Sequence, residues 1–150
     1  MSVRRKGDPW MPAADYGRLL AESGHPLGFN LIVRDIAAAL PFHLEVLEAN
    51  SVYHDPDIAV LQRQGAQWML HAHHTYDAHP WHPVLASDAM RGVATELRLF
   101  GRDPDQAESI AAGLGFRILQ GSADKPHGLR EVFIVDQDGF VWAIGKACTR

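Results

Sequence analysis

The stretch DKPHGLREVFIVDQDGFVWAI, residues 124–144, decides the fold of this chain, because it contains two strands and the turn that joins them. Glu131–Val135 is a short β-branched and aromatic run, and Phe140–Ile144 is a second apolar run. The turn Asp136-Gln137-Asp138-Gly139 separates them, and its glycine adopts positive φ without a steric cost. The stretch therefore predicts a β-hairpin that follows a polar loop.

The rest of the chain divides into two halves of similar pattern, separated by a polar, proline-containing loop at 73–91. Hydrophobic periodicity, capping residues and turn residues predict the elements of each half. In the first half we expect a strand at 27–33, a helix at 36–48 and strands at 50–54, 58–63 and 66–72. In the second half we expect a strand at 92–100, a helix at 104–112 and a strand at 116–119 before the hairpin.

The junction between the first strand and the helix has the same residue pattern in both halves. LIVRDIAAAL (31–40) and LFGRDPDQAE (99–108) each pass from an apolar strand end through Arg-Asp into a helix. Asp35 is expected to cap the first helix, and Pro41 inside that helix is expected to kink it or to delay its regular part. A repeat of about 65 residues is too long for a solenoid unit.

The repeat predicts an α+β fold of two paired βαβββ modules, at about 27–72 and 92–146, within a single domain at 27–150. In each module a curved mixed sheet is expected to place its convex face on the helix. The two concave faces are expected to pair around a shared cavity. Residues 1–26 form an N-terminal arm, and its pattern at 13–21 predicts about two helical turns. We expect this arm to pack on its own domain or on a partner subunit; a lid over a ligand site and disorder are the alternatives.

Composition excludes several classes of function. The formal charge of −4 argues against a nucleic-acid partner, which usually binds a basic surface. No apolar run approaches the length of a membrane span, and none follows the basic residues 4–6 as a signal peptide would require. The single cysteine, Cys148, has no partner within the chain for a disulfide, which favours a reducing, cytoplasmic location.

Both halves carry motifs of a known superfamily. The strand–helix junction reads Val33-Arg34-Asp35-Ile36, followed by FHLEVLE at 42–48, and the hairpin reads PHGLREV at 126–132 and DQDGF at 136–140. These motifs resemble those of the vicinal oxygen chelate superfamily, which includes glyoxalase I, extradiol dioxygenases and bleomycin-resistance proteins. The resemblance covers about residues 27–146, and it implies the paired-module fold and a homodimer. His43, Glu48 and His127 replace a tyrosine, a glycine and a tryptophan of the superfamily pattern.

The metalloenzymes of this superfamily hold a divalent metal at four strand positions. Transferred by spacing, these positions correspond here to Gly28, Met69, Glu96 and Ala143. One carboxylate among four positions cannot hold a hard divalent ion. The resemblance therefore implies the fold but not the metal chemistry, and we expect no metal cofactor.

Strand alternation then predicts which side chains line the cavity. We expect Asn30, Met69, His71, Glu96 and Arg98 to bind the ligand. His127 and Arg130, in the hairpin, are further candidates. A second interpretation of Glu96 and Arg98 is that they pair with each other, since a buried charge needs a partner. A second interpretation of Asn30 is that it is an interior amide whose hydrogen bonds are satisfied within the protein. For Arg130 and Glu131 the second interpretation is that they close the hairpin and a dimer interface.

Five histidines gather at 71–82, in the loop between the modules. Their spacing matches no closed zinc motif and no cysteine lies nearby, so a polar loop is the simpler interpretation. The alternative is a metal site that departs from the superfamily geometry and uses His71, His73 and Glu96.

Three functions remain open at this point. The first is a metal-independent protein that binds a small molecule, such as an antibiotic or a metabolite, as a sequestering protein of the bleomycin-resistance branch would. The second is a glyoxalase- or dioxygenase-type enzyme, a metal-dependent lyase or dioxygenase, with a non-standard metal site. The third is a regulatory domain that uses the arm or the histidine loop as a contact surface. We favour the first, and the sequence does not decide whether the protein is an enzyme.

Overall fold

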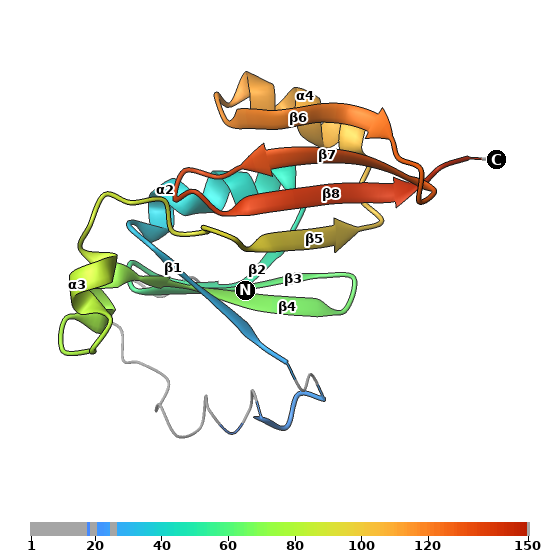
Figure 1. Cartoon of the computed structure of the whole chain (residues 1–150). Coiled ribbons are helices and arrows are strands. Elements are labelled where there is room, and N and C mark those ends of the chain that lie inside the picture. Colours follow the sequence, from blue (N-terminus) through green and yellow to red (C-terminus); the bar gives the residue numbers. More distant parts are fainter. Residues whose placement is uncertain (1–17, 19–20, 25–26, 150) are drawn as a thin grey trace.

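A computed structural model describes residues 18, 21–24 and 27–149 of the chain (Figure 1). Most of the N-terminal arm, including most of the helical turns expected at 13–21, lies outside these residues. Within the described part of the chain, no helix is long and apolar enough to cross a membrane.

Two βαβββ modules make up the described structure, as the repeat predicts. The first comprises β1 (Phe29–Val33), α2 (Ile36–Pro41), the π-helical turn η1 (Phe42–Val46), β2 (Asn50–His54), β3 (Ile58–Arg63) and β4 (Ala66–Ala72). The second comprises β5 (Glu96–Phe100), α4 (Pro104–Gly113), β6 (Arg117–Asp124), β7 (Leu129–Val135) and β8 (Val141–Ala147). The strand orders are β1-β4-β3-β2 and β5-β8-β7-β6, so the first strand of each module runs parallel to its last.

The helix of each module begins where the sequence predicts. The side chain of Asp35 accepts a hydrogen bond from the backbone N–H of Ala38 at 2.7 Å, and Asp103 caps α4 in the same way. Pro41 ends the regular part of the first helix, because its nitrogen carries no hydrogen for an i→i−4 bond. The chain continues as a π-helical turn, in which the N–H of Leu47 donates to the carbonyl of Phe42.

Side chains alternate between the two faces of each sheet. On β5, Leu97 and Leu99 are buried toward the helix whereas Glu96 and Arg98 are exposed on the opposite face, here called the open face. On β4, Trp68, Leu70 and Ala72 face the helix, whereas Gln67, Met69 and His71 lie on the open face. The predicted register is therefore confirmed on both strands.

The loop expected at 73–91 contains two short helices, η2 (His73–Tyr76) and α3 (His82–Leu85). The pattern of polar residues and prolines does not predict them, because each is a single turn, too short to show helical periodicity. The guanidinium of Arg91 donates to the carbonyl of Leu85 at 2.7 Å, and the hydroxyl of Thr75 donates to that of Ala72. The strand expected at 92–100 begins only at Glu96, and β6 extends five residues beyond the expected 119.

The modules join through their helix-facing sides. The rings of Trp68 and Trp142 lie 5.9 Å apart, and those of Phe42 and Phe116 lie 5.0 Å apart, within one hydrophobic core. Figure 1 shows the two sheets as separate layers, with β5 as the strand of the second sheet nearest the first. Two cavities are lined by the first module, the segment before it and the loop after it, and neither includes a residue of the second module, so neither is the cavity expected between the modules of one chain.

Candidate functional site

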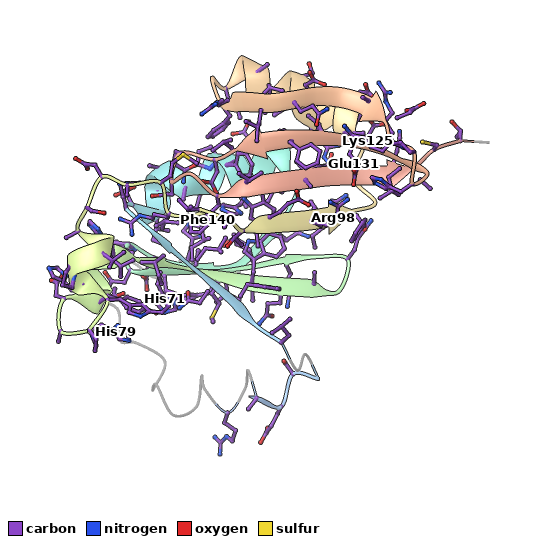
Figure 2. All side chains as sticks on the ribbon, viewed as in Figure 1. His71, His79, Arg98, Lys125, Glu131 and Phe140 are labelled. Carbon is purple, nitrogen blue, oxygen red and sulfur yellow. The ribbon has the colours of Figure 1, made fainter. Side chains whose placement is uncertain are left out.

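A cavity of about 550 Å³ lies on the open face of the first sheet, where η2 follows β4. Its size falls in the range of sites for small organic molecules. Its lining combines apolar, aromatic and polar side chains: Asp57, Ile58, His71, Thr75, Tyr76 and His79. Figure 2 shows His71 and His79 near α3, at one end of the molecule.

A chain of hydrogen bonds holds the polar side of this cavity in place. Nδ1 of His71 lies 2.5 Å from Oδ1 of Asn30, and Nδ2 of Asn30 donates to the hydroxyl of Tyr76 at 2.8 Å. Asn30 and His71 come from the adjacent strands β1 and β4, whereas Tyr76 is the last residue of η2. Two predicted ligand residues, Asn30 and His71, therefore bond to each other, and a tyrosine that the sequence did not single out bonds to Asn30.

The orientation of the Asn30 amide indicates which nitrogen of the His71 ring carries the hydrogen. A carbonyl oxygen only accepts hydrogen bonds, so Nδ1 of His71 carries the hydrogen that Oδ1 of Asn30 receives. In the neutral ring, Nε2 is then an acceptor. Burial lowers the pKa of His71 below its usual value, and the negative charge of Asp55 offsets part of that effect. The ring is thus neutral near pH 7.

Aromatic rings continue along the cavity wall from His71. Tyr76 makes an edge contact with His71 on one side, at 6.1 Å between centroids, and with His79 on the other, at 5.0 Å. The ring of Trp81 follows His79 at 5.7 Å. Tilted rings in a row offer faces and edges on which a flat ligand packs favourably.

The carboxylates near the cavity already have partners. Asp57 is the one charged acid in the lining, and its Oδ1 lies 2.6 Å from Nε2 of His74. Asp55 is buried and accepts hydrogen bonds from Tyr53 and from the backbone N–H groups of Asp57 and Ile58. The six lining residues include no lysine or arginine.

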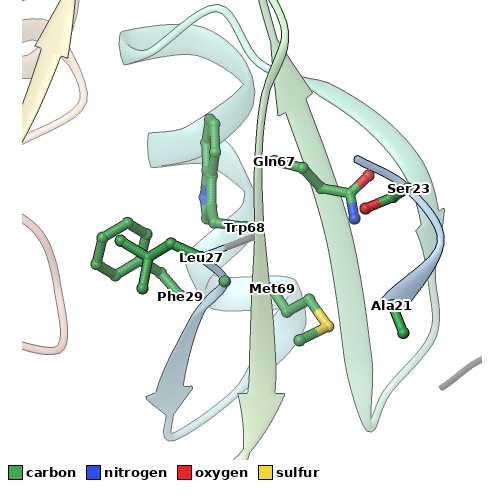
Figure 3. A pocket seen from close by; sticks show the side chains of 8 residues that line it. Ala21, Ser23, Leu27, Phe29, Gln67, Trp68 and Met69 are labelled. Carbon is green, nitrogen blue, oxygen red and sulfur yellow. The ribbon is translucent and has the colours of Figure 1, made fainter. Parts of the chain in front are cut away.

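A second, smaller cavity of about 230 Å³ lies at the other end of β1 (Figure 3). Gly28 and Met69, two of the positions that correspond to metal ligands in the superfamily, line it together with Trp68 and Gln67. Ala21, Ser23 and Leu27, from the segment before β1, and Phe29 of β1 complete its wall. This cavity is small for a drug-sized molecule, and neither Gly28 nor Met69 has a carboxylate or an imidazole with which to hold a hard metal ion.

Arg98 lies apart from both cavities, on the open face of the second sheet (Figure 2), and Glu96 lies on the same face of β5. Nη1 of Arg98 lies 2.5 Å from Oε1 of Glu96, so the interpretation that these two residues pair with each other is confirmed. Nη2 of Arg98 also binds the buried carboxylate of Glu131, which is 2% exposed. The predicted candidate His127 is the other partner of Glu131, with Nε2 at 3.0 Å from Oε2.

Arg130 does not join this cluster. Its guanidinium binds Asp105 of α4 at 2.6 Å and Asp124 of β6 at 2.9 Å, so it stabilises the packing of the helix on the hairpin. The interpretation of Arg130 as a ligand residue gains no support from this position.

The metal set His71, His73 and Glu96 is not brought together. Among residues 18, 21–24 and 27–149, no three His, Cys, Asp or Glu side chains converge in a way that could hold a metal ion. Arg91 donates toward Nδ1 of His73, which directs this ring toward α3.

Tyr76 was not singled out from the sequence, and His79 was considered only as one of the five histidines at 71–82. Tyr76 and His79 lie in the segment expected to be a plain loop, and periodicity carries no information on a single turn of 3₁₀-helix. Glu131 was considered only as a residue that closes the hairpin. Its alternation with the buried Val132 on β7 was the available signal that it faces the same side as Arg98.

No protein-family model matches the sequence, and no curated protein is similar to it in sequence. Solved structures nevertheless share its fold. A glyoxalase/bleomycin resistance protein/dioxygenase family enzyme from Burkholderia phytofirmans PsJN superposes with a TM-score of 0.67 at 16% identity, over 81% of this chain and 97% of that one.

Two further solved structures share the fold of this chain. A glyoxalase-related enzyme from Fulvimarina pelagi has a TM-score of 0.65 at 19% identity, over 82% of this chain and 88% of that one. A glyoxalase/bleomycin resistance protein/dioxygenase superfamily member from Sphaerobacter thermophilus DSM 20745 has a TM-score of 0.60 at 22% identity, over 82% and 97% of the two chains. The chain therefore has the fold of this superfamily, as its motifs predict.

Proposed function

We propose that this protein binds a small organic molecule, without a metal ion, in the cavity on the open face of its first sheet. The observation that carries the proposal is the cavity of about 550 Å³ with a fixed hydrogen-bond network on one side and aromatic rings on the other. Such a combination orients a ligand through a few polar groups while apolar contacts supply affinity.

The donor set supports a metal-independent site. Gly28, Met69 and Ala143 occupy three of the four positions that correspond to metal ligands, and none has a side chain that a hard divalent ion prefers. At the fourth position, the carboxylate of Glu96 is paired with Arg98. A glyoxalase- or dioxygenase-type metalloenzyme, the second function considered, has no comparable support.

We further propose that the protein is a homodimer. The open face of the second sheet carries the polar cluster around Glu131 and the exposed ring of Phe100, and neither cavity includes any of it. A second copy would place that face against the ligand site of the first. Sedimentation equilibrium should give twice the chain mass, and a monomer at all concentrations would contradict the dimer without affecting the cavity.

A thermal-shift screen tests the binding function. We expect compounds from a library of aromatic metabolites and antibiotics to raise the melting temperature equally with and without EDTA, since binding to the folded state alone stabilises it. Thr75→Trp, which fills the cavity, should abolish the shift, whereas Thr95→Trp, on an exposed loop outside the cavity, should not. A shift that requires added metal, or the absence of any stabilising compound, would contradict the proposal.

A further inference from the structure

We propose that the cavity selects an uncharged, planar aromatic molecule through a ring hydroxyl that donates a hydrogen bond to Nε2 of His71. This inference rests on the proposed function and names the chemical class of its ligand.

The acceptor is defined by the network behind it. Because Nδ2 of Asn30 donates to the hydroxyl of Tyr76, Oδ1 of Asn30 faces His71 and takes the hydrogen of Nδ1. The lone pair of the neutral ring is therefore at Nε2, which has no hydrogen-bond partner among the described residues. In the bond from Nδ2 of Asn30, the hydroxyl oxygen of Tyr76 is the acceptor, so the hydroxyl hydrogen of Tyr76 is available to donate to a ligand.

The charges around the cavity favour a neutral ligand. A carboxylate or phosphate would meet no lysine or arginine in the lining, and it would lie near Asp57. An ammonium group would find Oδ1 of Asp57 already bonded to His74 and the carboxylate of Asp55 buried behind three hydrogen bonds. A hydroxyl needs no counter-charge, so it matches the neutral acceptor of His71.

The aromatic wall favours a flat ligand. His71, Tyr76 and His79 follow one another with edge contacts, and Ile58 adds an apolar surface to the same cavity. Nδ1 of His79 accepts the backbone N–H of Trp81, which fixes the orientation of that ring. A planar ring system packs against such a wall with little loss of its own conformational freedom.

Four naphthalene derivatives of nearly equal shape test the inference. Titrations with 2-naphthol, 2-methoxynaphthalene, 2-naphthoate and 2-naphthylmethylammonium at pH 7.5 compare a hydroxyl with a group that cannot donate and with both charges. We expect 2-naphthol to bind about fivefold more tightly than 2-methoxynaphthalene, the effect of one net hydrogen bond. We expect both charged compounds to bind more weakly than 2-naphthol.

Variants separate the acceptor from the shape of the site. In His71→Phe the affinities for 2-naphthol and 2-methoxynaphthalene should become equal. Asn30→Leu should reduce the ratio of the two affinities, because Nδ1 of His71 then has no acceptor and the hydrogen can move to Nε2. His82→Phe, a matched change in α3 outside the cavity lining, should behave as the wild type. Thermal unfolding of each variant confirms that it folds.

The outcomes distinguish this inference from the proposed function. Equal affinities for 2-naphthol and 2-methoxynaphthalene in the wild type, or tightest binding of a charged compound, would overturn the hydroxyl inference and leave the binding function standing. A ratio that persists in His71→Phe would also overturn it. No binding of any of the four compounds would contradict the inference, and failure of the thermal screen as well would contradict the proposed function.

Discussion

Asp138, in the turn of the closing hairpin, accepts a hydrogen bond from the backbone N–H of Arg34 at 2.9 Å, although 104 residues separate them in the sequence. The same Oδ1 lies 3.2 Å from the guanidinium of Arg34 and 3.7 Å from Nε of Arg91. Asp138 is 2% exposed. The hairpin of the second module thus holds the end of the first strand of the first module.

Loss of this carboxylate charge should weaken the junction of the modules. We expect Asp138→Asn to lower the free energy of unfolding by about 2 kcal/mol, because it removes charge-assisted hydrogen bonds from a buried acceptor. Asp124→Asn, which weakens an exposed ion pair with Arg130, should cost less than about 0.5 kcal/mol. Urea unfolding of both variants measures the difference, and equal losses would show that the junction does not depend on Asp138.

A second prediction concerns the buried groups His43 and Asp136. Burial lowers the pKa of His43 to about 3 and raises the pKa of Asp136 to about 6. Between pH 6 and 4 the unfolded chain therefore binds up to one more proton at position 43, and the folded chain binds up to one more at position 136. As the pH falls, the first effect lowers the stability of the fold, and the second raises it by a similar slope.

Asp136→Asn should reveal how the buried His43 makes the free energy of unfolding depend on pH. Between pH 6 and 5, the unfolding free energy of this variant should fall more steeply than that of the wild type, by about 1 kcal/mol per pH unit, because folded Asp136 is only partly protonated over this range. Urea unfolding at pH 7, 6 and 5 measures both slopes, and all other titrating groups cancel in the comparison. Parallel slopes for the two proteins would mean that Asp136 does not take up a proton in this range.

A third prediction concerns Gly92, where the chain passes the closing hairpin. A Cβ at this position would come within 2.6 Å of the backbone Cα of Phe140 and 2.7 Å of the carbonyl of Gly139. Gly92→Ala should therefore destabilise the protein by about 3 kcal/mol, since backbone atoms cannot move aside. Gly113→Ala, in α4 with open space around it, should be neutral or stabilise by about 0.5 kcal/mol. Thermal unfolding compares the two, and a tolerated Gly92→Ala would contradict this packing.

A fourth prediction concerns the buried carboxylate of Glu131. Arg98→Leu removes its main cationic partner and should cost about 2 kcal/mol, because the carboxylate then stays buried with His127 alone. The double variant Arg98→Leu, Glu131→Leu should recover much of that loss. Glu96→Gln affects only the exposed side of the cluster and should cost less than about 0.5 kcal/mol. Chemical denaturation of all four proteins tests this order, and a double variant less stable than Arg98→Leu would contradict it.

Local signals account for the parts of the fold that could be predicted from the sequence. Asp35 and Asp103 cap their helices, Pro41 ends the regular part of its helix, and Glu96 alternates with Leu97 as a half-buried strand requires. Each of these features depends on neighbours within a few residues, so the pattern of the chain contains it. The same reasoning identified Asn30 and His71 as side chains of one sheet face.

The position of the cavity could not be predicted in this way. It depends on η2, a single turn whose residues look like a loop, and on Tyr76, which meets Asn30 across 46 residues of sequence. The expected grouping of Glu96 and Arg98 with His71 failed for a similar reason. Strand alternation places residues on a face, but it does not determine which faces of two modules come together.

The sequence by itself determined the two βαβββ modules, the faces on which the side chains of β4 and β5 lie, and a hairpin around the turn at 136–139. These follow from hydrophobic periodicity and turn chemistry, which act over short distances along the chain. Only the tertiary structure decided that the modules join by their helix-facing sides, through Trp68, Trp142 and the bond from Arg34 to Asp138. It also decided the tautomer of His71, because packing between distant segments and burial of polar groups select one partner among many that the sequence allows.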